Sequence, residues 1–281
     1  MCWVCGRKPD YYQNTMSKFT DERDGRGTKE WSDISYNICI GCAHECRYCY
    51  AHSQACWTKA QMRISGEWAK QKLNPNRARL GAEIGPVGVV MFPTSHDITP
   101  EFLGQSLETI RNLLRHNKVL IVSKPHLSVI RVLCKELADR RADILFRFTI
   151  GSLNKALCAY WEPGAPTPQE RLKCLQHAFN QGFATSVSAE PMLDDLAGTI
   201  KLVDRVSPWV TDTIWLGKMG KIPWRHNSHV PGFVAAGKRI KALQTDQEIL
   251  KLVDALAGRK QVRWKDSIQK VLAKNGNSRS L

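Results

Sequence analysis

The sequence predicts an α/β protein: a partial, TIM-barrel-like (β/α) barrel of six parallel strands with a basic, mainly helical C-terminal extension. Short β-branched apolar segments alternate with helical segments about every 30 residues, which is typical of a parallel sheet covered on both faces. Glycine and polar residues follow these segments directly, as they do at the active end of a barrel. The strands are expected at residues 34–40, 88–92, 119–122, 144–150, 184–189 and 213–216.

Six strands do not close an eight-stranded barrel, so we expect an opening on one side that admits a large substrate. A doubly wound sheet gives the same alternation, and the choice of a barrel therefore depends on the cysteine loop described below. Polar residues that follow the strands are expected to share one site. They are Ser95, Asp97, Lys124, Ser152, Asn154, Glu190 and Lys218.

The helices are predicted from apolar periodicity and from their end signals. The first strand runs into the cysteine loop, and a helix is expected over 53–72, ended by Asn74-Pro75. Thr99 is expected to cap the next helix, with Pro100 in its first turn. The apolar face of that helix carries Leu103, Leu107, Ile110 and Leu114. Later helices are expected at 127–139, 168–181 and 247–257, with a last one after 262–268.

Three parts of the chain are distinguished. Residues 1–30 are expected to be an irregular segment with a Cys-x2-Cys pair, 31–220 the barrel, and 221–281 the extension, packed across the barrel's open edge. A length of 281 residues with 43% hydrophobic residues is enough for one large core. No stretch approaches the ~18 consecutive apolar residues of a membrane span. The N-terminus carries no apolar leader, so a cytoplasmic protein without a membrane span is expected.

Positive charge is concentrated towards the C-terminus. The net charge is +15, and from Lys218 onward 14 Lys and Arg face only four Asp and Glu. A surplus of this kind favours a polyanionic partner such as nucleic acid, with Lys260, Arg263 and Lys265 as candidate contacts. A solvated helix face without a partner is the alternative.

Cysteines cluster at the other end of the chain. Seven of the ten fall within the first 56 residues, which favours metal binding over disulfides in a reducing compartment. Cys2 and Cys5 are candidates for zinc or a second metal, but two ligands do not make a site. The missing ligands would come from Cys39, His52 or Cys56, and ordinary free thiols are the alternative. The three later cysteines are expected in the core. They are Cys134, Cys158 and Cys174.

Cys42, Cys46 and Cys49 form a Cys-x3-Cys-x2-Cys loop directly after the first predicted strand. Four cysteines hold an ordinary [4Fe–4S] cluster, so three leave one iron open for another ligand. A zinc site from Cys2, Cys5, Cys46 and Cys49 is the competing interpretation, and it leaves Cys42 unused. The spacing, with Tyr48 before the last cysteine, resembles the radical S-adenosylmethionine (radical SAM) superfamily.

A longer resemblance covers about residues 34–220 and points to the branch that includes spore photoproduct lyase. It is carried by the loop at 41–51 and by the Glu-Pro-containing segment 161–172. The chain departs from the lyase at Pro93, where the lyase carries the cysteine that donates hydrogen to its product radical. The resemblance therefore implies the chemistry of the branch and not the lyase's substrate.

This resemblance also implies roles for single residues. Tyr48 would line the adenine side of S-adenosylmethionine, Ser95 would bond its methionine carboxylate or amine, and Lys124 would face the carboxylate. Ser152 and Asn154 would reach the ribose hydroxyls. Each role has an alternative: Ser152 and Asn154 are common helix caps, and Lys124 is as readily a solvated or glutamate-paired lysine.

Two further expectations concern residues beside these. Glu162 and Arg171 are expected to form a structural pair away from the substrate, and His44 is expected at the surface.

The predicted function is that of a radical SAM enzyme, whose reduced cluster cleaves S-adenosylmethionine to a 5′-deoxyadenosyl radical that takes hydrogen from a substrate. Nucleic acid is a candidate substrate. The chain shows no flavin motif, so an external flavodoxin- or ferredoxin-like one-electron donor is expected. The alternatives are a zinc-binding nucleic-acid-binding protein without enzymatic activity and an electron-transfer protein.

Overall fold

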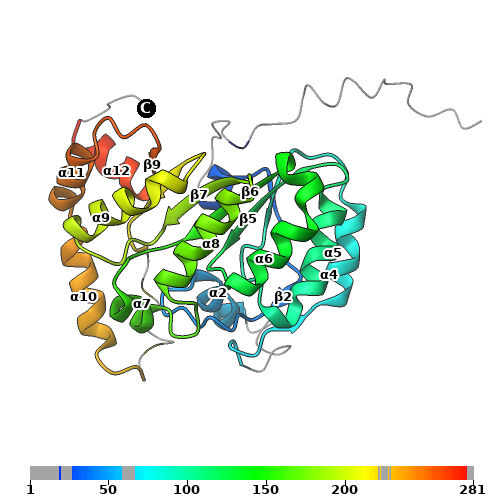
Figure 1. Ribbon diagram of the computed structural model, residues 1–281. Coiled ribbons are helices and arrows are strands. Elements are labelled where there is room, and N and C mark those ends of the chain that lie inside the picture. Colours follow the sequence, from blue (N-terminus) through cyan, green and yellow to red (C-terminus); the bar gives the residue numbers. More distant parts are fainter. Residues whose placement is uncertain are drawn as a thin grey trace, which may run out of the picture.

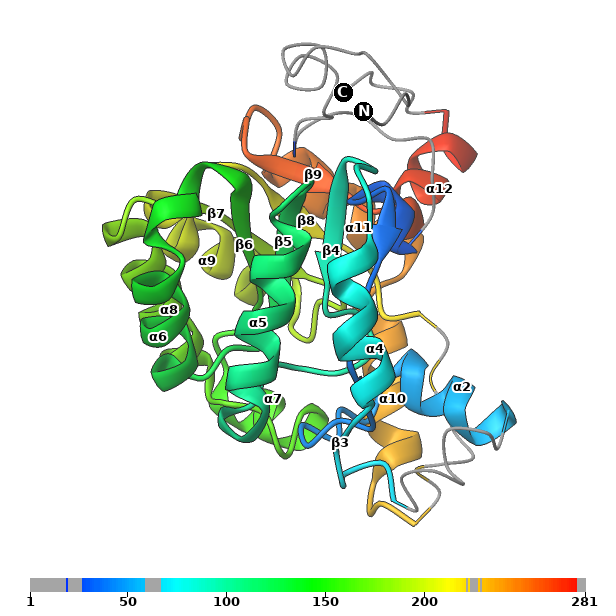
Figure 2. The ribbon, with the colours of Figure 1, turned by 90° about the vertical axis from the view of Figure 1, so that its right-hand side faces the viewer.

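The computed structural model describes residues 27–58, 67–220 and 229–276, together with Phe19, Ile222 and Asn227. Its centre is a curled parallel sheet of seven strands, ordered β1-β4-β5-β6-β7-β8-β9, which forms a half-barrel (Figures 1 and 2). The strands are β1 (Ile34–Ser35), β4 (Val89–Phe92), β5 (Lys118–Ser123), β6 (Ile144–Thr149), β7 (Ala184–Ala189), β8 (Ile214–Leu216) and β9 (Val262–Trp264). The predicted partial barrel is therefore confirmed, with one strand more than expected.

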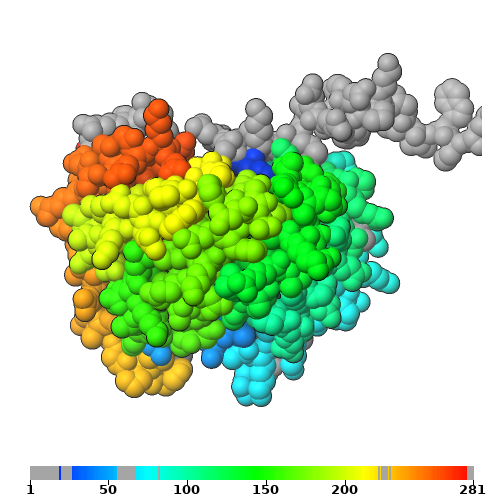
Figure 3. Space-filling view, viewed as in Figure 1, coloured from blue at the N-terminus to red at the C-terminus, as the bar shows by residue number. Residues whose placement is uncertain are grey.

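Helices surround this sheet, and α6, α8 and α9 form one continuous outer surface in the space-filling view (Figure 3). The α-helices are α2 (Tyr50–Thr58), α4 (Pro75–Leu80), α5 (Leu103–Leu113), α6 (Leu127–Glu136), α7 (Lys155–Trp161), α8 (Pro168–Asn180), α9 (Leu196–Val206), α10 (Phe233–Leu243), α11 (Asp246–Ala255) and α12 (Asp266–Lys274). Short 3-10 helices lie at Gly27–Glu30, Gly81–Glu83, Pro100–Phe102, Ala138–Asp143 and Ser207–Trp209. None of the described helices is both long and apolar enough to cross a membrane.

The strands divide their side chains between an outer and an inner core, because successive residues of a strand point to opposite faces. Val90 and Phe92 face outward into the large core shared with the helices, whereas Val89 and Met91 face inward beside Trp31. The buried cysteines Cys134 and Cys174 belong to the outer core, and Cys158 of α7 belongs to a smaller cluster that includes Phe233 and Ile240 of α10. Their expected burial is confirmed.

The first predicted strand is wrong in its length. Only Ile34–Ser35 joins the sheet, and Cys39–Ile40 forms β2 of a separate antiparallel pair with β3 (Lys72–Leu73). The chain leaves the sheet at Asn37, whose side-chain oxygen accepts hydrogen bonds from the backbone N–H groups of Thr94 and Ser95. The helix expected over 53–72 was also wrong at both ends, since α2 begins at Tyr50 and Lys72 lies in β3.

Three further differences have local causes. Thr99 does not cap its helix, because a 3-10 turn follows it and its side chain is buried without a capping hydrogen bond. The helices α7 and α9 were not predicted, although Asn154 and Asp195 cap them with their side chains. The strand β9 comes from the segment expected to be a helical extension and pairs with β8, so part of that extension completes the sheet.

Candidate active site

A cavity of about 610 Å³ lies at the carboxyl ends of the strands, within the half-barrel. The loops after β2, β4, β5, β7 and β8 supply its wall, as the position of polar residues in the sequence predicted. Predicted site residues on this wall are Cys42, Cys46, Cys49, Tyr48, Ser95, Asp97, Lys124, Glu190 and Lys218. Ser152 and Asn154 are not part of the wall.

Backbone contacts from two directions hold the cysteine loop. The N–H of Cys42 donates to the carbonyl of Trp68 over 2.8 Å, and the N–H of Arg47 donates to the carbonyl of Trp161 over 2.9 Å. Gly41 has a φ of +79°, and its ideal Cβ would lie 2.6 Å from the Trp68 carbonyl oxygen, so only glycine fits this approach. The loop is therefore held in place before any ligand binds.

The three thiols of this loop suit a cluster. All are free of disulfides, and Cys42 and Cys49 pack against the buried residues Ala51, Ala55 and Trp68. Burial raises the pKa of Cys46 to about 12, and the nearby Lys124 ammonium only partly opposes this. The free thiols are consequently protonated, and metal binding must release their protons.

Within the described ranges, no three His, Cys, Asp or Glu side chains converge on one ion. A cubane does not need such convergence, since each thiolate binds a different iron. The residues present therefore fit a cluster with three protein ligands. Cys2 and Cys5 lie outside the described residues, and a metal there stays a prediction.

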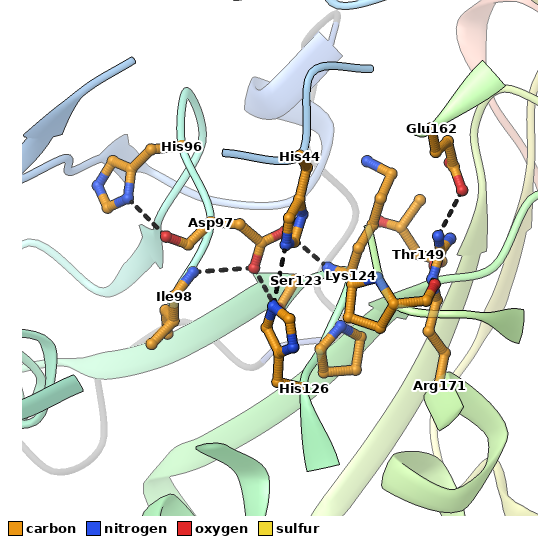
Figure 4. A network of polar contacts seen from close by, with 12 residues as sticks. His44, His96, Asp97, Ile98, Ser123, Lys124, His126, Thr149, Glu162 and Arg171 are labelled. Atoms are coloured by element: carbon orange, nitrogen blue, oxygen red, sulfur yellow. Dashed lines mark hydrogen bonds and ion pairs between the residues drawn. The ribbon is translucent and has the colours of Figure 1, made fainter. Parts of the chain in front are cut away.

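A buried ion pair contacts the cysteine loop through Tyr48. The carboxylate of Glu162 and the guanidinium of Arg171 are 2.6 Å apart, and both side chains are fully buried (Figure 4). The Tyr48 hydroxyl donates to the other carboxylate oxygen of Glu162. Burial raises the pKa of Glu162, but the charges of Arg171 and Lys124 and the hydrogen bonds from Arg171 and Tyr48 together lower it overall. The predicted structural pair is confirmed, and it also fixes Tyr48 in the cavity wall.

Lys124 lines the same cavity as the three cysteines. Its Nζ is 5.5 Å from the centre of the Tyr48 ring, and no carboxylate of the described residues forms an ion pair with it. Burial lowers the pKa of Lys124, but the carboxylates of Glu162 and Asp97, together with Cys46 when it is a thiolate, raise it overall. The structure thus places a stable positive charge at the cavity, beside the cysteine loop.

The expectation that His44 lies at the surface was wrong. Its ring is buried, with Nδ1 3.2 Å from the Asp97 carboxylate and Nε2 3.4 Å from Nε2 of His126 (Figure 4). Asp97 also accepts hydrogen bonds from the Ser123 hydroxyl and from the N–H groups of Ile98 and Lys124. Burial alone would raise the pKa of Asp97, yet His44, the charge of Lys124 and the hydrogen bond from Ser123 lower it to about 2. A single histidine inside a loop gives no periodic signal, so the sequence did not reveal this anchor.

The remaining predicted contacts divide into two groups. Ser95 lies on the wall, and its backbone is fixed by Asn37. Ser152 is buried and donates to Asp194 over 2.6 Å, while the side chain of Asn154 caps α7. This geometry favours the helix-cap alternative for Asn154, whereas Ser152 bonds Asp194 and the Asn154 N–H and caps no helix. Contact of either residue with ribose stays a prediction.

Comparisons with known proteins add to this geometry. No family model matches the sequence. The uncharacterized protein ORF301 of Acidianus two-tailed virus is 24% identical over 186 residues, which span 63% of this chain and 62% of the viral protein. That match reaches less than two thirds of the viral protein.

Solved structures share the fold. One is a mutant of spore photoproduct lyase, with a TM-score of 0.54 and 11% identity over 92% of this chain and 78% of the lyase. Another is Streptococcus suis SuiB bound to precursor peptide SuiA, with a TM-score of 0.58 and 14% identity over 86% of this chain and 50% of SuiB. This chain shares its fold with both enzymes. SuiB is about twice as long as the part that this chain spans.

Proposed function

We propose that this chain is a radical SAM enzyme. The observation that carries the proposal is the position of the three thiols: Cys42, Cys46 and Cys49 lie on one fixed loop, in the wall of the cavity at the carboxyl ends of a half-barrel. A fold shared with spore photoproduct lyase and SuiB supports it, because both combine this half-barrel with radical chemistry. Each thiolate would bind one iron of a [4Fe–4S] cluster and leave the fourth iron open.

When bound and supplied with one electron, the cluster and S-adenosylmethionine provide a 5′-deoxyadenosyl radical that takes hydrogen from the substrate. The protein's own contribution is position and charge. Lys124 offers a positive charge to the methionine carboxylate, the Ser95 hydroxyl offers a hydrogen bond, and Tyr48 forms the wall on the adenine side. Packing against Ala51, Ala55 and Trp68 covers part of Cys42 and Cys49.

The remaining parts of the proposal concern partners. An external flavodoxin- or ferredoxin-like protein would supply the electron, and the cytoplasm is the expected location. Nucleic acid stays a proposed substrate or partner, contacted by Lys260 and Arg263. Lys265 is removed from this set, because its side chain is buried. The lyase binds a dinucleoside photoproduct and SuiB a precursor peptide, so the fold itself is used with both kinds of substrate.

Cluster assembly tests the proposal. The protein is reconstituted anaerobically with iron and sulfide, reduced, and examined by electron paramagnetic resonance with and without S-adenosylmethionine. We expect about four irons per chain and a spectrum that changes when S-adenosylmethionine is added. Cys46→Ala should lose the cluster, whereas Cys134→Ala, which removes a buried thiol outside the loop, should keep it. A colourless protein that binds only zinc would contradict the proposal and support the zinc-binding alternative.

A further inference from the structure

His44 lies in the middle of the cysteine loop, between Cys42 and Cys46, and is only 1% exposed. The next residue, Glu45, has a φ of +45°, and no other non-glycine residue of the described ranges has a positive φ. A residue with a side chain keeps this left-handed conformation only where its surroundings impose it. Contacts on both sides of His44 supply such surroundings.

The backbone and the ring of His44 are held by different parts of the chain. Its carbonyl accepts a hydrogen bond from the N–H of Gly164 over 3.1 Å. An ideal Cβ on Gly164 would lie 2.1 Å from the carbonyl oxygen of Ala43, so no larger residue fits there. On the ring, Nδ1 is 3.2 Å from Oδ2 of Asp97, and Nε2 is 3.4 Å from Nε2 of His126 (Figure 4). An ionised carboxylate only accepts hydrogen bonds, so it favours the proton of His44 on Nδ1 and leaves Nε2 to accept from His126.

The Asp97 carboxylate joins the cysteine loop to Lys124. The oxygen Oδ2 that faces the His44 ring also accepts a hydrogen bond from the backbone N–H of Lys124 over 2.8 Å. The other oxygen accepts from the N–H of Ile98, over 2.9 Å, and from the Ser123 hydroxyl, so the carboxylate itself is fixed. One carboxylate oxygen thus contacts both the loop that carries the three thiols and the residue that brings a positive charge to the cavity wall.

We propose that His44 is a positioning residue, which acts through Asp97 to set the place of the cysteine loop relative to Lys124. This inference rests on the proposed function, because it concerns how S-adenosylmethionine fits the cavity. S-adenosylmethionine would have to contact the cluster on the loop and the Lys124 ammonium at the same time. The two groups belong to different elements of the fold, and groups that bind one ligand together must be held to within about 0.5 Å.

Two substitutions separate the two contacts of the His44 ring. The amide nitrogen of asparagine is as many bonds from the backbone as Nδ1, and that of glutamine is as many bonds away as Nε2. His44→Asn therefore keeps a donor for Asp97 and loses the contact with His126, whereas His44→Gln does the reverse. His116→Gln, which alters an exposed histidine outside the cavity, is the control.

Each variant is reconstituted anaerobically with iron and sulfide, and its affinity for S-adenosylmethionine is measured by isothermal titration calorimetry. We expect about four irons per chain in all of them. His44→Asn should bind S-adenosylmethionine within about threefold of the wild type, and His44→Gln should bind it about tenfold more weakly. His116→Gln should leave the affinity unchanged.

A double-mutant cycle tests the coupling to Lys124, which a general weakening of the fold would not produce. Lys124→Met removes the charge and should lower the affinity for S-adenosylmethionine by about tenfold or more. Because His44 acts by placing the loop relative to that charge, adding His44→Gln to Lys124→Met should cost less than about threefold more. Independent effects would instead multiply to about a hundredfold in total.

Three results would overturn the inference. An affinity of His44→Asn no higher than that of His44→Gln would show that the contact with Asp97 does not decide binding. Losses that multiply in the double variant would show that His44 does not act through the place of Lys124. Loss of iron from His44→Gln would assign His44 to assembly of the cluster. Failure of the proposed function has a different sign, since the wild type itself would then take up no cluster or bind no S-adenosylmethionine.

Discussion

Removing the positive charge of Arg171 should destabilise this protein more than most single substitutions. Arg171→Met would leave the Glu162 carboxylate fully buried without its partner at 2.6 Å. It would also remove the donors to the backbone carbonyls of Pro166 and Thr149. Breaking a buried pair on one side costs about 3–5 kcal/mol of folding free energy. Lys124 and Tyr48 remain near Glu162, so we expect the lower half of that range.

An exposed ion pair provides the matched control. Arg259 and Asp204 are 2.7 Å apart, nearly the same distance, but their side chains are 51% and 50% exposed. Pairs of this kind contribute about 0–1 kcal/mol, so Arg259→Met should have little effect. The assay is urea unfolding at pH 7, which gives the free energy of unfolding of each variant. Equal losses for Arg171→Met and Arg259→Met would refute the assignment of Glu162 and Arg171 as the buried support of the cavity.

Removing both partners should cost less than removing one. The double variant Glu162→Gln with Arg171→Met no longer contains the stranded Glu162 carboxylate, so it should be more stable than Arg171→Met alone. A double variant that is the less stable of the two would show that the cost of Arg171→Met does not come from the stranded carboxylate.

Three further predictions concern other parts of the chain. Burial lowers the pKa of His96 from 6.5 to about 4, so its contribution is complete above pH 6.5 and is lost as the pH falls towards 4. We expect unfolding to show a loss of about 3 kcal/mol across this window that His96→Asn removes. Asn154→Ala should cost about 1 kcal/mol through loss of the α7 cap, with unchanged affinity for S-adenosylmethionine; a large loss of that affinity would restore its predicted role at the ribose. Replacing Lys260 and Arg263 with glutamine should lower the salt dependence of nucleic-acid binding by about two counterions, and an unchanged slope would remove these residues as contacts.

The elements that the sequence predicted well are those with a strong repeating pattern. The strands β4 to β7 have four to six residues each, β4 to β6 are mainly apolar, and the boundaries of all four were found to within about two residues. The strands β1, β2 and β9 have two or three residues each, which is too short for a pattern to appear. Their pairing depends on tertiary contacts, such as the clamp that Asn37 forms on the loop after β4.

In the candidate site, too, the features with a sequence pattern were predicted and those that depend on tertiary contacts were not. Cysteine spacing and the position of polar residues after strands brought Cys42, Ser95 and Lys124 to one cavity. Contacts between residues that lie far apart in the sequence were not predicted. Burial of His44 depends on Asp97, which lies 53 positions further along the chain, and the burial of Lys265 depends on Glu30 and Glu190. Lys265 belongs to the basic C-terminal segment of the sequence, but its side chain is buried inside the protein.

The most direct test of the radical SAM assignment is chemical. The reconstituted protein is reduced with dithionite under anaerobic conditions, S-adenosylmethionine is added, and 5′-deoxyadenosine is quantified by chromatography. We expect 5′-deoxyadenosine to form, and we expect Cys42→Ala and Cys46→Ala to abolish its formation while Cys134→Ala does not. A wild-type protein that carries the full cluster and binds S-adenosylmethionine, yet produces no 5′-deoxyadenosine, would contradict the assignment.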